Sequence, residues 1–124
     1  MENMLIQGTK SSPNVEFDAA SGKIMMSGSS YPENASEFYH PLLNWIDKYT
    51  MEVSKEIKAD FGFKYLNSSS VKLISEMVDK LNKLNSAGIP VEINWRCVRG
   101  DEDIFDLGEE FKEEVSCKFN IIED

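Results

Sequence analysis

Short β-compatible runs, several of which alternate apolar and polar residues, predict strands in five parts of the chain. The first two runs are separated by a turn through Gly22, so we expect them to form a hairpin. The third run alternates apolar and charged residues around Gly62, which is typical of a strand with one buried face. The expected strands cover residues 15–18, 23–26, 56–66, 91–98 and 118–122.

Apolar positions spaced three to four residues apart predict three amphipathic helices between these strands. The first should begin near Pro32, and Pro41 within it predicts a kink or a division into two abutting helices. The second follows apolar positions from Val71 onward and ends in the segment NSAGIP. The third lies in the segment RGDEDIFDLGEEFKEEV, residues 99–115, and has acidic residues at its N-terminus.

The resulting order, β-β-α-β-α-β-α-β, places helices between the later strands, where they act as crossover connections. It predicts an α/β fold in which helices cover a mixed or partly parallel sheet. A chain of 124 residues can bury one core but is too short for two ordinary domains. We therefore expect one compact domain over residues 1–124.

Composition narrows the class of partner. Hydrophobic residues make up 41% of the chain and charged residues 28%, a balance typical of a soluble globular domain. The 22 acidic and 13 basic residues give a formal net charge of −9, which disfavours nucleic acid and suits either cationic protein surfaces or solubility alone. The sequence shows neither a long apolar run nor an N-terminal targeting segment, so we expect no membrane insertion and a cytoplasmic location.

Residues arranged for catalysis are scarce. The single histidine, His40, is accompanied by no GxSxG or HExxH motif, and no P-loop or GxGxxG follows a predicted strand. Cys97 and Cys117 lack the spacing and the companion histidines of a zinc site, so reduced thiols are expected. Acidic residues between Asp101 and Glu114 leave the alternative of a small metal-binding protein or enzyme, but their spacing suits a solvated helix face better. We expect no enzyme, no cofactor and no metal.

The segment FGFKYLNSSSVKLI, residues 61–74, carries three consecutive serines between a predicted strand and a predicted helix. Asn67 or one of the serines could accept a hydrogen bond from a free backbone N–H and so cap the helix. A serine at the positive end of a helix could equally accept a phosphate, because free amides and the helix dipole favour an anion there. Spacing alone favours capping.

Three stretches together resemble successive blocks of the SiaC family of bacterial regulatory phosphoproteins, with a likeness that extends from about Thr9 to Phe119. They read TKSSPNVEFDAASGKIMMSGSSYPENASEFYHPLLNWIDKY, FKYLNSSSVKLI and VEINWRCVRGDEDIFDLGEEF, and SYPEN and YLNSSS are their most specific parts. The resemblance implies a fold similar to STAS domains and anti-sigma-factor antagonists. It also implies a partner switch in c-di-GMP signalling, with biofilm or aggregation as the controlled output. The resemblance implies that the unphosphorylated form activates a diguanylate cyclase, that a histidine-kinase-like serine/threonine kinase phosphorylates the protein, and that a PP2C-type phosphatase reverses this.

Carried over by residue, the family's phosphoacceptor falls on Ser68, with Ser69 as the alternative, and we expect Ser69 and Ser70 to serve as cap and loop residues. Phosphate on Ser68 is expected to block docking of the cyclase by charge and bulk. An anti-sigma-factor antagonist is the alternative output of the same kind of switch. The family implies a monomer, although an apolar stripe around Trp45 could pair subunits. The expected partner-binding residues are Tyr31, Glu33, Asn34, Tyr65, Leu66, Asn67, Ser68, Ser69 and Ser70.

Overall fold

Six strands form one mixed sheet in the computed structural model, which describes residues 1–124. The strands are β1 (Met4–Ile6), β2 (Asn14–Asp18), β3 (Lys23–Ser30), β4 (Ile57–Leu66), β5 (Val91–Cys97) and β6 (Lys118–Glu123). The helices are α1 (Ala35–Glu52), α2 (Ser68–Ser86) and α3 (Glu102–Glu114). Strand order in the sheet follows the sequence. The pairs β1–β2 and β2–β3 are antiparallel, and the pairs β3–β4, β4–β5 and β5–β6 are parallel.

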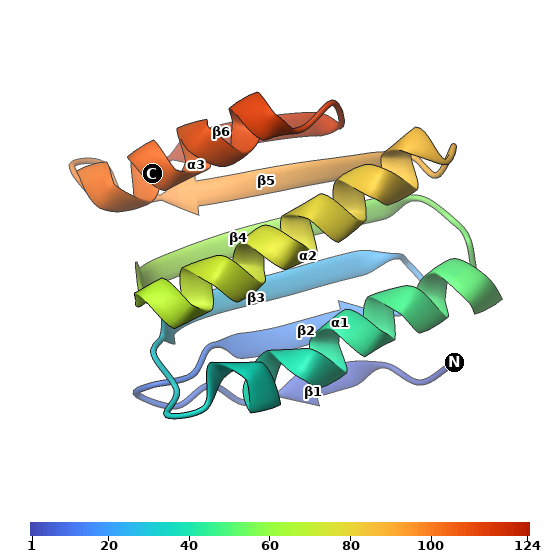
Figure 1. Ribbon diagram of the computed structural model, residues 1–124, viewed down its shortest axis with the longest axis horizontal. Coiled ribbons are helices and arrows are strands. Elements are labelled where there is room, and N and C mark those ends of the chain that lie inside the picture. The colour runs from blue at the N-terminus through green and yellow to red at the C-terminus, as the bar shows by residue number, and fades with distance from the viewer.

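All three helices lie across the same face of the sheet (Figure 1). Each connects two adjacent parallel strands, and successive right-handed crossovers that advance in one direction place their helices on one side. The predicted α/β class with a mixed sheet is confirmed, and the helices form one layer over one face.

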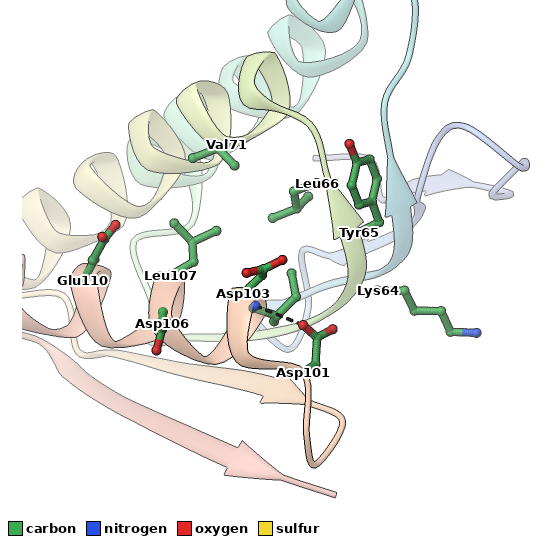
Figure 2. Close-up of a pocket in the computed structure, with 10 residues that line it drawn as sticks. Lys64, Tyr65, Leu66, Val71, Asp101, Asp103, Asp106, Leu107 and Glu110 are labelled. Atoms are coloured by element: carbon green, nitrogen blue, oxygen red, sulfur yellow. Dashed lines mark hydrogen bonds between the residues drawn. The ribbon is translucent and has the colours of Figure 1, made fainter.

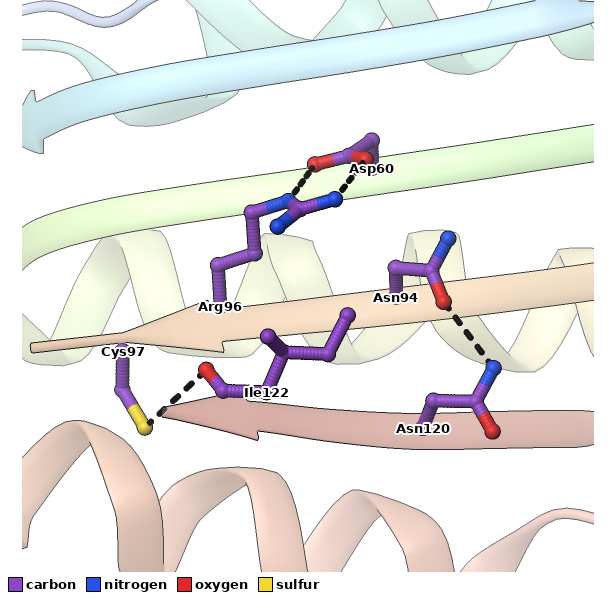
Figure 3. A network of polar contacts seen from close by, with 6 residues as sticks. All are labelled: Asp60, Asn94, Arg96, Cys97, Asn120 and Ile122. Carbon is purple, nitrogen blue, oxygen red and sulfur yellow. Dashed lines mark hydrogen bonds and ion pairs between the residues drawn. The ribbon is translucent and has the colours of Figure 1, made fainter. Parts of the chain in front are cut away.

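Polar side chains occupy much of the opposite face of β4, β5 and β6 (Figure 3). Arg96 on β5 donates from Nε to Asp60 on β4 at 2.8 Å, and Asn120 on β6 donates to Asn94 at 2.9 Å. These residues alternate with buried ones such as Ile93. The pattern is that of strands with one face in the core and one in solvent.

The core lies between the sheet and the helices, with Trp95 of β5 fully buried within it. The indole Nε1 of Trp95 donates to the carbonyl oxygen of Ile104 on α3 at 2.9 Å. Gly108 permits the close approach, because a Cβ atom there would lie 2.5 Å from Cδ1 of Trp95. Trp95 and Gly108 therefore fix α3 against the sheet.

Helix α1 differs from the sequence prediction at its start, and at Pro41 it excludes the alternative of two abutting helices. It begins at Ala35 rather than near Pro32, because the side chain of Asn34 caps it by accepting from the amide of Glu37 at 3.1 Å. Pro41 lies inside one helix rather than between two, on the exposed side of that helix. Trp45 faces the core and is only 6% exposed, so the alternative of subunit pairing through this stripe is wrong.

Two features of the sheet escape the hydrophobic pattern. β1 has only three residues and was not predicted. In β4 the pairing with β3 shifts by one residue, so Phe63 pairs with Gly28 while Tyr65 pairs with Ser29. This bulge interrupts the alternation and leaves Tyr65 54% exposed at the end of the strand.

Candidate functional site

The carboxyl ends of β3 and β4 bring the two most distinctive sequence segments together. The carbonyl oxygen of Ser30, the last residue of β3, accepts from the amide of Asn67 at 3.1 Å. Just beyond, the rings of Tyr31 and Tyr65 contact each other edge to face, with 5.8 Å between centroids. Both rings are partly exposed, Tyr31 by 37%. SYPEN and YLNSSS thus form one continuous surface at this edge of the sheet.

Asn67 caps α2 and sets where it begins. Its backbone is extended, and its side-chain oxygen Oδ1 accepts from the amide of Ser70 at 2.9 Å. The helix therefore starts at Ser68, three residues before the apolar pattern that begins at Val71. All three serines are helical residues in the first turn, so the expectation that Ser69 and Ser70 are cap and loop residues is wrong.

The three serines have different surroundings. Ser68 and Ser69 are exposed, whereas Ser70 is fully buried. The Ser70 hydroxyl lies 2.9 Å from that of Ser30, which lies 2.7 Å from the hydroxyl of Tyr39 on α1. Burial raises the pKa of Tyr39, although hydrogen bonds to the two serines act in the opposite direction. Ser70 therefore links three elements in the interior and is not a surface contact, contrary to the sequence prediction.

The SYPEN segment both starts α1 and borders the serines. Glu33 and the cap residue Asn34 are exposed, and they share a groove of about 370 Å³ with Ser69, Lys72 and other residues of α2. The sequence left open whether SYPEN fixes the entry into its helix or forms part of the serine surface. The structure places it in both positions.

A second recess opens on the other side of the α2 start, between the end of β4 and α3 (Figure 2). We call it the β4–α3 pocket, and its volume is about 380 Å³. Figure 2 shows Leu66, Val71 and Leu107 around its interior, with the carboxylates of α3 along one side. The lining residues are Lys64, Tyr65, Leu66, Val71, Asp101, Asp103, Ile104, Asp106, Leu107 and Glu110.

The chemistry of the remaining candidate groups is plain. No three histidine, cysteine or acidic side chains come together in a way that could hold a metal ion, so the acidic helix gives no support to a metal site. Cys97 and Cys117 are free and buried, and burial raises the pKa of both thiols. His40 is exposed on α1.

No helix is both long enough and apolar enough to span a membrane.

Sequence reasoning missed the buried partners of the serine segment. Ser30 and Tyr39 lie 40 and 31 positions before Ser70 in the sequence, and only the folded chain brings their hydroxyls together. One signal was present, since Ser30 is the first residue of SYPEN and Tyr39 follows five residues after its end, in the same characteristic block of the sequence. The β4–α3 pocket had no such signal, because its walls come from three elements.

Comparisons with known proteins agree with this geometry. The model of the SiaC family of regulatory phosphoproteins matches residues 6–124. An uncharacterised protein of Pseudomonas aeruginosa strain UCBPP-PA14 is 33% identical over 121 residues, which cover 98% of this chain and 96% of that protein.

Two solved structures from the same species are similar over almost the whole chain. SiaC of P. aeruginosa has a TM-score of 0.94 at 31% identity, with full coverage of both chains. A crystal structure of the diguanylate cyclase SiaD in complex with its activator SiaC gives a TM-score of 0.93 at 32% identity, covering 98% of this chain and 99% of the matched one. This chain therefore belongs to the SiaC family of regulatory phosphoproteins, and it is a regulatory protein rather than an enzyme.

Proposed function

We propose that the unphosphorylated chain, acting as a single SiaC-like domain, binds and activates a diguanylate cyclase, and that phosphorylation of Ser68 prevents this. A histidine-kinase-like serine/threonine kinase adds the phosphate and a PP2C-type phosphatase removes it. The chain thereby controls c-di-GMP production without catalysing a reaction. Its similarity to the SiaC that was crystallised with the cyclase SiaD supports the cyclase as its target.

The observation that carries the proposal is the position of Ser68. It is the first residue of α2 and is exposed, and the first turn of α2 contains no acidic residue. Helix geometry leaves the first amides without acceptors inside the helix, and the dipole makes this end positive. A phosphate, which carries about −1.5 to −2 charge at pH 7, would be stabilised there.

Ser69 is exposed too, but its surroundings favour a phosphate less. Its groove contains the carboxylates of Glu33 and Glu76 as well as the ammonium group of Lys72. Two carboxylates would repel the phosphate dianion more than one lysine attracts it at similar range. Ser68, in contrast, lines neither this groove nor the β4–α3 pocket, which supports it as the acceptor over Ser69.

The surface that meets the cyclase, in this proposal, surrounds Ser68 and includes the Tyr31–Tyr65 pair. Exposed aromatic rings are enriched where proteins bind one another. A phosphate on Ser68 changes the charge of this surface and adds bulk at the start of α2. Docking is weakened while the fold stays intact.

Phosphopeptide mapping tests the acceptor. The purified chain is incubated with ATP and the cognate kinase, and wild type is compared with Ser68→Ala and with the matched control Ser69→Ala. Modification should vanish in the first variant and persist in the second. Full modification of Ser68→Ala would show that another residue is the acceptor.

The target is tested by co-purification and by cyclase activity. Unphosphorylated chain should bring down a GGDEF-domain protein and raise its rate of c-di-GMP synthesis, and the phosphorylated chain should do neither. Recovery of an anti-sigma factor alone would assign the chain to the alternative output of a partner switch.

A further inference from the structure

We propose that the β4–α3 pocket is the docking site for a segment of the diguanylate cyclase that carries an apolar side chain next to an arginine or lysine. This inference rests on the proposed function and adds the chemistry of the contact. The pocket opens beside the proposed interface, because Tyr65 and Leu66 belong to both.

The interior of the pocket is suited to an apolar side chain. Leu66 from β4, Val71 from α2 and Leu107 from α3 line it, and all three are partly exposed in the free chain. Tyr65 adds a ring that is 54% exposed at the rim. Three elements thus offer apolar surface that would leave water when a partner side chain enters.

The rim selects the charge of the partner. Four carboxylates and one ammonium group line the pocket, with Lys64 as the single base. Asp101 is engaged as the cap of α3, where its Oδ1 accepts from the amide of Ile104 at 3.2 Å. The other three carboxylates take part in none of the four salt bridges of the chain, and they belong to Asp103, Asp106 and Glu110.

The directions of these side chains make the rim a binding element. Figure 2 shows the carboxylates of Asp103 and Glu110 on opposite sides of Leu107, with that of Glu110 directed toward α2. A cation beside an apolar anchor could therefore meet a carboxylate at either end of the apolar interior. Complementary charge of this kind raises the association rate and fixes the register of a docked segment.

Phosphate on Ser68 would interfere with a cationic occupant through its position and its bulk rather than through repulsion. Ser68 lies two residues after Leu66 and one helical turn before Val71, next to the lining of the pocket. The phosphate dianion attracts the same cation that the rim holds, and it adds bulk between β4 and α2. The segment is then drawn out of register with the apolar interior.

The test uses two matched double variants of α3 in the full chain. Asp103→Asn with Glu110→Gln removes two charges that line the pocket. Glu102→Gln with Glu109→Gln removes two exposed charges from the neighbouring positions, which do not line it. Both pairs have the same spacing and the same change in net charge. Binding to the purified cognate cyclase is measured by calorimetry at about 50 and about 300 mM salt.

The pocket pair should weaken cyclase binding about tenfold at low salt, while the control pair stays within about twofold of wild type. The difference should narrow at high salt, because screening reduces the charge contribution in wild type. Equal losses in both pairs, or wild-type affinity in the pocket pair, would overturn the inference. Unchanged cyclase binding together with slower phosphorylation by the kinase would assign the pocket to the kinase instead.

The proposed function fails by a different result. If unphosphorylated wild-type chain does not bind the cyclase at either salt concentration, the cyclase is not its target, and the docking inference falls with it. Binding by wild type that is insensitive to the pocket pair removes only the docking inference.

Discussion

Helices α2 and α3 begin on either side of the β4–α3 pocket with the same cap but with opposite charge. Asn67 accepts from the amide of Ser70 at 2.9 Å, and Asp101 accepts from the amide of Ile104 at 3.2 Å. The first turn of α3 contains two acidic residues besides its acidic cap, whereas that of α2 contains none. The dipole of α3 is already neutralised, and that of α2 is left free for an added anion.

The two helix starts therefore suit different roles in the proposed function, one as the place of an added charge and the other as a source of fixed charge. The start of α2 gains from a phosphate, because nothing in its own first turn competes for the free amides. The start of α3 supplies fixed negative charge that no modification is needed to create. In the proposed function, a partner surface that contacts both helix starts would meet a charge that phosphorylation changes at α2 and a charge that stays constant at α3.

Gly108→Ala should have the largest effect on stability, because Gly108 lies where α3, the helix with the fixed negative charge, packs against Trp95 of the sheet. An added Cβ would meet Cδ1 of Trp95 at 2.5 Å, and Trp95 cannot move without disturbing its hydrogen bond to Ile104. Overpacking of this kind costs about 1–3 kcal/mol of the free energy of unfolding, partly offset by the better helix propensity of alanine. Urea denaturation measures it. Wild-type stability would mean that α3 can shift away from the sheet.

Ser70→Ala should be next, at about 1 kcal/mol, because it removes a fully buried hydroxyl from the contact with Ser30. Ser69→Ala, one position earlier and exposed, is the matched control and should stay within about 0.5 kcal/mol of wild type. Both are measured by urea denaturation. Equal losses in the two variants would show that the serines contribute through helix propensity rather than through the buried hydroxyl contact.

The sequence predicted the strands and the apolar faces of the helices well, because both depend on regular spacing along the chain. Apolar positions such as Ile74, Met77 and Leu81 are buried as their period predicts. The resemblance to the SiaC family named Ser68 as the expected phosphoacceptor, which spacing could not distinguish from its neighbours and which stays a prediction. The family and the fold can therefore both be predicted from the sequence.

The features that the sequence did not predict depend on residues far away in the chain or on local changes in the backbone. Ser70 is buried because Ser30 lies 40 residues earlier in the chain and beneath it in space. Tyr65 is exposed because one bulge shifts the pairing of β4 with β3. The start of α2 is set by the cap geometry of Asn67 rather than by the apolar period. No local pattern records any of these.

The third prediction concerns the two cap residues, which make the same kind of hydrogen bond but differ in charge, so that removing them should respond differently to salt. Asn67→Ala and Asp101→Ala each remove a side-chain acceptor and should each cost about 0.5–2 kcal/mol. Because the Asn67 side chain is neutral, Asn67→Ala should reduce the free energy of unfolding by the same amount at low and at high salt. The cost of Asp101→Ala should fall as salt rises, since part of it is the interaction of a charge with the helix dipole. Denaturation at two salt concentrations measures both.

Ser68→Asp should have the smallest effect and bears most directly on the difference between α2 and α3. An acidic side chain at the first position of α2 should stabilise the fold by about 0.3–1 kcal/mol, although the chain already carries a net charge of −9. The control is Ser86→Asp, which adds the same charge at the exposed last residue of the same helix, where the dipole is reversed. Both variants add one negative charge, so the change in net charge affects their stability alike. Beyond that common change, thermal or urea denaturation at low salt should show Ser68→Asp to be stabilising and Ser86→Asp to be destabilising. If the two variants shift stability equally, the start of α2 does not favour an anion, although its first turn contains no acidic residue. The physical basis for a phosphate on Ser68 would then be lost.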